Sequence, residues 1–173
     1  KEREDPSSHH FALTKQLIRA MMQSLEVMVQ EAGSYAARHE LELMVHESDD
    51  NPLEKEWAVG RFEKLSGSVA LLGMYASKTA PGSQAYQNAA AVFQWMSSLK
   101  SARAQILQCA KDGAKAEERV SELGSGDGEE LTAAKADAAQ VAEETLKCRQ
   151  DFKKTALEGA DGLAALAIVL SVK

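Results

Sequence analysis

The feature that most constrains this chain is a pair of apolar seams on either side of a glycine-rich segment. In each seam, apolar or small residues follow one another at alternating steps of three and four positions, which keeps one stripe of a helix facing a partner. The first seam consists of Val92, Trp95, Leu99, Ala102, Ile106, Cys109, Gly113, Ala116, Val120 and Leu123. The second consists of Leu131, Ala134, Ala138, Val141, Thr145, Cys148 and Phe152. Because GSGDG (124–128) separates them, the two helices are predicted to form an antiparallel hairpin.

Stop signals divide the whole chain into four predicted helices, at about 8–47, 53–79, 83–123 and 128–172. The sequence Asn51-Pro52-Leu53-Glu54 is typical of a capping box at the start of the second helix, and Asp127-Gly128-Glu129-Glu130 of a cap on the fourth. At 1.5 Å per residue the last two helices would each be on the order of 60 Å long. The predicted fold class is all-α, an elongated antiparallel helical bundle of three to four long helices. Residues 1–173 are expected to form a single extended domain.

The first predicted helix carries a wide apolar face. One stripe of it consists of Phe11, Ile18, Met21, Leu25, Met28, Ala32 and Tyr35, and the next of Met22, Val29, Ala36 and Leu43. A face of this width predicts packing against at least two neighbouring helices. Large apolar residues are interpreted as core on the same basis: Met21, Met22, Met28, Met44, Trp57, Phe93 and Trp95.

Charge and hydropathy exclude some classes of partner. The chain has 20 basic and 26 acidic residues and a net charge of −6, so it lacks the cationic surplus expected of a protein that binds nucleic acid. The longest apolar run, Leu163–Leu170, is far shorter than the roughly 20 residues needed to span a bilayer. Membrane attachment would therefore require an anchor outside this segment. No Asn-x-Ser/Thr acceptor for N-linked glycan is present.

The two cysteines lie one on each seam. Cys109 and Cys148 fall at slightly different distances from the glycine segment, so a modest asymmetry in the turn would bring them within reach of each other. In a secreted protein this arrangement predicts a disulfide. In a cytosolic protein the same positions predict two buried thiols that act as small core residues.

No motif for catalysis or cofactor binding occurs in the sequence. Phosphate-binding glycine loops, Gly-x-Ser-x-Gly, HExxH and CxxC are all absent. His39, Glu42 and His46 are spaced to share one side of a helix and resemble half of a metal site, but no Glu-x-x-His pair completes it. We therefore interpret them as part of a solvated face, and we expect no catalytic residue, no metal and no cofactor.

Alanine and glutamate together make up roughly a quarter of the residues, as in AKAEERVSELGSGDGEELTAAKADAAQVAEE (114–144). Combined with long antiparallel helices and a lone cysteine pair, this composition resembles the helical surface proteins of African trypanosomes, in particular the glutamic acid- and alanine-rich coat proteins of the insect stage. The resemblance implies an extended bundle held at the cell surface by a carboxyl-terminal lipid anchor and packed beside neighbouring coat proteins. Of functional residues it carries over only the cysteine pair, Cys109 and Cys148.

Three functions are compatible with these features. The first is a non-enzymatic surface coat protein that shields the parasite membrane as an elongated rod. The second is a surface receptor for a host macromolecule, which would need an exposed apolar or aromatic patch near its membrane-distal end. The third is an intracellular helical adaptor with both thiols reduced. The sequence does not indicate which residues would form a binding surface.

Overall fold

A computed structural model of the chain describes residues 6–49, 52–53, 56–124 and 128–171. Within these residues the protein is all-helical, without strands, and its helices pack against one another. The described part contains four α-helices and one π-helix: α1 (Pro6–Glu47), η1 (Glu56–Arg61), α2 (Phe62–Ala76), α3 (Gln84–Glu122) and α4 (Glu129–Ser171). The predicted all-α class is confirmed at this level.

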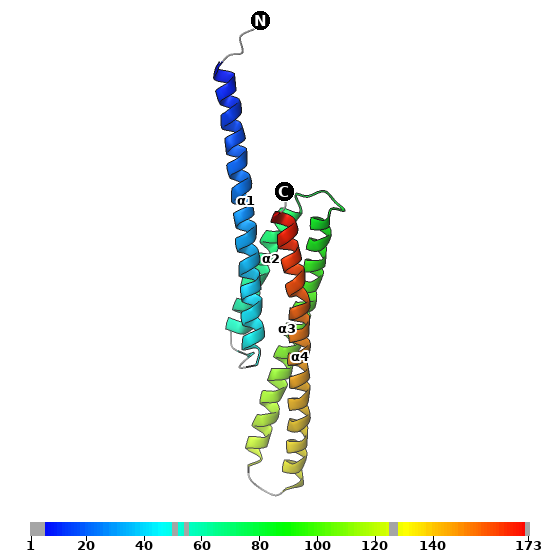
Figure 1. Ribbon diagram of the computed structural model, residues 1–173. Helices are drawn as coiled ribbons and strands as arrows, with labels where there is room; N and C mark the ends of the chain where they lie inside the picture. Colours follow the sequence, from blue (N-terminus) through cyan, green and yellow to red (C-terminus); the bar gives the residue numbers. More distant parts are fainter. Residues whose placement is uncertain (1–5, 50–51, 54–55, 125–127, 172–173) are drawn as a thin grey trace.

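Helices α3 and α4 lie side by side along most of their length (Figure 1). Their contact uses the two predicted seams, whose members are all buried or half-buried. Fully buried seam residues include Leu99 and Ile106 on α3 and Phe152 on α4. The three–four spacing therefore predicted the facing sides of both helices correctly. Residues 125–127 of the turn, including the predicted cap at Asp127, lie outside the described part.

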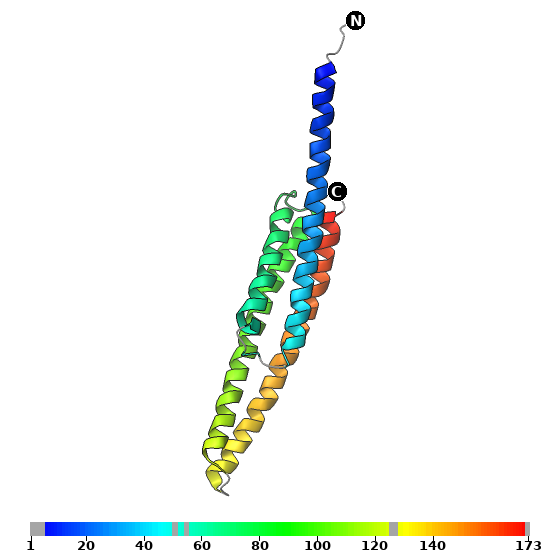
Figure 2. The same ribbon diagram turned by 90° about the vertical axis from the view of Figure 1, so that its left-hand side faces the viewer.

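Helices α1 and α2 lie against only one half of the α3–α4 pair (Figure 2). The main core fills this four-helix part and draws on every helix: Ala37, Leu41, Met44, Trp57, Leu65, Val69, Leu72, Ala76, Ala85, Ala89, Val92, Leu99, Ala102, Ile106, Phe152, Ala156 and Leu163. In the other half, α3 and α4 pair without α1 or α2, and among the residues described there only Ala116, Leu131 and Ala134 are buried (Figure 1).

The start of α3 follows the usual rule for helix capping, whereas the start of the second predicted helix does not. Ser83 caps α3, because its hydroxyl accepts a hydrogen bond from the Tyr86 amide at 3.3 Å. The second helix was expected to be α-helical from about residue 53, but it begins with the π-helix η1. The wider π-turn lies where Trp57 enters the core and donates its indole N–H to the Met44 carbonyl at 2.9 Å. Asn51 and Glu54 of the predicted capping box lie outside the described residues.

The predicted burial of the α1 stripe is wrong. Phe11, Ile18, Met21, Leu25 and Met28 are all 52–72% exposed, and Tyr35 is 76% exposed. A different face of α1, which carries Ala37, Leu41 and Met44, contacts the rest of the bundle. Spacing alone identified a shared face, but it did not show whether a partner helix reaches that face.

Other assignments to the core have mixed outcomes. Trp57 and Met44 are buried and Trp95 is half-buried, as predicted. Phe93 is 46% exposed, and Met21 and Met22 are exposed as well. Among the helices of the described part, none combines the length and apolar character that crossing a bilayer requires.

Candidate functional site

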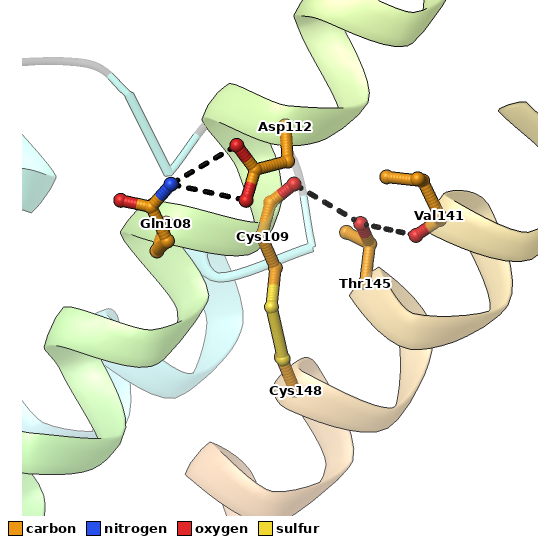
Figure 3. Close-up of a disulfide and its surroundings, with 6 residues drawn as sticks. All are labelled: Gln108, Cys109, Asp112, Val141, Thr145 and Cys148. Carbon is orange, nitrogen blue, oxygen red and sulfur yellow. Dashed lines mark hydrogen bonds between the residues drawn. A yellow bond between two sulfur atoms is a disulfide. The ribbon is translucent and has the colours of Figure 1, made fainter. Parts of the chain in front are cut away.

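The two predicted seams meet at a disulfide between Cys109 of α3 and Cys148 of α4 (Figure 3). The Cα atoms of the two cysteines are 6.9 Å apart, and both residues are half-buried. One helical turn away, toward the four-helix part, the fully buried Ile106 and Phe152 follow on the same seams. The disulfide thus lies near the boundary between the four-helix core and the two-helix part, where it holds α3 and α4 in register.

Thr145 adds a polar link beside the disulfide. Its hydroxyl donates to the Val141 carbonyl at 2.8 Å and lies 3.3 Å from the Cys109 carbonyl across the helix pair (Figure 3). A hydroxyl group that is removed from water needs a hydrogen-bond partner within the protein. The two carbonyl groups near the Thr145 hydroxyl meet this need, so a threonine can occupy a position between the two helices. The disulfide and Thr145 together form a structural layer between α3 and α4.

The histidine group of α1 lies on the outer face of the helix. His39, Glu42 and His46 are all exposed, and the His39 ring stacks on Tyr35 with centroids 6.4 Å apart. Among the residues that the structure describes, no cluster of three or more histidine, cysteine or acidic side chains could hold a metal ion. Within the described residues, no side chain from another helix joins this group to form a metal site.

An arginine clamp that sequence reasoning missed joins η1 to α1. Arg61 donates two hydrogen bonds to the Glu47 carboxylate, at 2.8 and 3.1 Å, and a third to Glu40 at 3.4 Å. The hydrogen bond with Glu47 raises the pKa of the Arg61 guanidinium above its usual value. No spacing signal could have revealed this contact, since the partners belong to different helices. Its geometry is that of a structural tie between α1 and η1.

The N-terminal part of α1 extends beyond the ends of the other helices (Figures 1 and 2). We call residues 11–28 the projecting segment, and every side chain described within it is exposed. Seven of its large apolar side chains gather on one side of the helix and form what we call the outer stripe: Phe11, Leu17, Ile18, Met21, Met22, Leu25 and Met28. A contiguous exposed apolar surface of this kind is the usual mark of an interaction site.

No protein-family model, no curated protein and no solved structure matches this chain. The function proposed below therefore rests on the fold, the disulfide layer and the outer stripe.

Proposed function

We propose that the protein is a non-enzymatic coat protein of the cell surface, an elongated antiparallel helical bundle that shields the membrane by its shape. The observation that carries this proposal is the α3–α4 pair, two helices of 39 and 43 residues held by a disulfide near their middle. Helices of this length are on the order of 60 Å long. A long, narrow, acidic particle without a reactive site is suited to covering a surface by excluded volume.

The disulfide also separates this proposal from the intracellular adaptor. Structural disulfides persist in oxidising compartments and are rare in the cytosol. A bond between Cys109 and Cys148 thus favours a protein that is exported. The membrane partner would be reached through a lipid anchor outside this segment, with neighbouring coat proteins on either side, as the resemblance to trypanosome surface proteins implies. A nucleic-acid partner is disfavoured by the net charge of −6.

Two measurements test the proposal. Small-angle scattering of the monomer, established by light scattering, should give a radius of gyration on the order of 25 Å, against roughly 15–16 Å for a compact domain of this length. On intact cells that make the protein, antibody should label it without permeabilisation, and phospholipase C should release it. A compact radius of gyration, or labelling only after permeabilisation, would refute the coat function.

A surface receptor is the second candidate, and the outer stripe is the observation that favours it. Its seven side chains are each 52–72% exposed. The stripe lies toward the same end of the bundle as the carboxyl end of α4 (Figure 1). An anchor following α4 would therefore place the stripe toward the membrane, whereas a receptor for a host macromolecule needs a membrane-distal patch. This placement ranks the receptor below the coat protein.

A further inference from the structure

The face of α1 that is apolar changes along the helix, near Gly33. Within the bundle, the residues along α1 that face the other helices follow one another at steps of three and four positions, and we call them the inner line. They are Gly33, Ala37, Leu41 and Met44, with Ser48 just after the helix, all of them buried. Continued toward the N-terminus with the same spacing, this inner line reaches Gln23, Arg19, Gln16 and Ala12, all of them exposed. The inner face is thus apolar or small where the bundle covers it and mainly polar where the bundle has ended.

The opposite change occurs on the outer stripe. Phe11, Ile18, Met21, Leu25 and Met28 follow one another at steps of three, four or seven, which places them on one side of α1. Beyond the projecting segment the same line continues through Tyr35, His39, Glu42 and His46, which are exposed on the solvent face of the bundle. The stripe is therefore not an unfinished part of the intramolecular core. Lengthening α2 or α4 would meet the polar inner line and leave the stripe uncovered.

We propose that the outer stripe pairs with the outer stripe of a second copy of this chain, with the two projecting segments antiparallel. The first support is area. Seven large side chains that are each more than half exposed present on the order of 100 Å² apiece, or on the order of 700 Å² together, close to the roughly 800 Å² that one partner contributes to a standard interface. Pairing two such stripes removes part of this apolar surface from water, which favours association.

Charge provides the second support and selects the orientation. The segment 11–31 has two basic residues near its beginning, Lys15 and Arg19, and two acidic residues near its end, Glu26 and Glu31. In an antiparallel pair the basic part of each helix lies at the same height as the acidic part of the other, and the attraction is long-range because Arg19 lies on the inner line, away from the contact. In a parallel pair, by contrast, like charges lie at the same height.

The same charges disfavour a membrane as the occupant. Helices that lie in a membrane interface are rich in lysine and arginine on their polar face. The polar inner line of the projecting segment has one arginine, Arg19, and two neutral glutamines, Gln16 and Gln23. The two basic and two acidic residues of 11–31 cancel, so this segment has no cationic surplus to attract anionic lipid.

Antiparallel pairing also matches the side chains in register. When Met21 lies opposite Leu25 of the second copy, Ile18 lies opposite its Met28 and Phe11 opposite its Tyr35. Each of these pairs then joins two residues from the same side of α1, one from each copy. The two bundles lie at opposite ends of the pair and on the side of α1 away from the stripe, so they do not obstruct each other.

This inference goes beyond the proposed coat function and does not depend on it. Two antiparallel copies with anchored carboxyl ends fit chains that lie along one membrane, because both carboxyl ends of α4 then lie near the middle of the pair (Figure 1). For that reason the pairing is tested on the full chain in solution. A failed dimer test leaves the radius of gyration of the monomer, and with it the test of the coat function, unaffected.

Light scattering coupled to size exclusion tests the pairing directly. The parent chain at tens of micromolar should have twice its 18.7 kDa monomer mass. The double variant M21E/L25E should be monomeric, with unchanged helicity, because both side chains lie outside the bundle core and are 60% and 57% exposed. The matched control Q16E/Q23E adds the same two negative charges on the exposed inner line and should remain dimeric.

A monomeric parent would overturn the proposal, as would equal dissociation of both variants. Vesicles of zwitterionic lipid, with and without anionic lipid, provide the competing outcome: a monomeric parent that binds them, while M21E/L25E does not, would assign the stripe to a membrane.

Engineered cysteines test the orientation. Under mild oxidation, a mixture of M21C and L25C chains should form covalent dimers several times faster than either variant alone, because antiparallel pairing puts residues 21 and 25 in one layer. Faster cross-linking of M21C with itself would indicate parallel pairing and refute the proposed register.

Discussion

Replacing both cysteines with alanine should remove a large share of the stability of this protein. The disulfide joins residues separated by 39 positions. In the chain-entropy model, opening a loop of that size lowers the free energy of unfolding by about 4 kcal/mol at 25 °C. Cys109 and Cys148 are only half-buried, so the lost sulfur atoms leave a small cavity that costs less than about 1 kcal/mol. The loop term therefore dominates the expected change.

The two-helix part of the molecule is less stable than the four-helix part. Among the described residues beyond the disulfide, only Ala116, Leu131 and Ala134 are buried, whereas the four-helix part has a large core that includes Trp57 and Leu72. Segments with few buried apolar contacts open at a lower free energy. Amides in 110–122 and 129–147 should therefore exchange faster than those of the four-helix core in the parent, whereas loss of the disulfide should accelerate most the core amides, which exchange through global unfolding.

Urea unfolding and thermal unfolding of C109A/C148A, both followed by circular dichroism, measure the global effect. The midpoint of thermal unfolding should fall by about 8–16 °C, since about 1 kcal/mol corresponds to about 2–4 °C for a chain of this size. Mild reduction of the parent should reproduce the same loss and is the control for side effects of the substitutions. A loss below about 1 kcal/mol, or unchanged exchange in the four-helix core, would refute this reasoning.

Three further substitutions test the packing, each followed by urea unfolding. Gly159→Ala should lower stability by about 1–3 kcal/mol, because the added Cβ would overlap the half-buried ring of Trp95. Gly67→Ala should instead raise the stability by about 0.5–1 kcal/mol, because a Cβ at this position meets only open space. If Gly159→Ala were the more stable of the two glycine variants, the packing described would be wrong. Trp57→Phe should cost about 1–3 kcal/mol through the lost hydrogen bond to the Met44 carbonyl, and a neutral effect would show that this bond contributes little.

The sequence by itself determined the parts of the fold that depend on neighbouring turns of one helix. The seams of α3 and α4 could be predicted because three–four spacing is a local property, and Leu99, Ile106 and Phe152 are buried where that spacing places them. The cysteines were located in the same way, one on each seam. Ser83 likewise caps α3 by a contact only three residues away.

Tertiary structure alone decided which faces are covered. Helix α1 has two lines with the same spacing, and the line of Leu41 and Met44 is buried while that of Ile18 and Leu25 is exposed. Periodicity shows which residues share a face, but burial depends on where the neighbouring helices end. The Arg61 clamp on Glu47 and the π-turn at Trp57 depend likewise on contacts between different helices. The candidate interaction surface could be found only when the ends of the bundle were known, because exposure belongs to the assembled molecule.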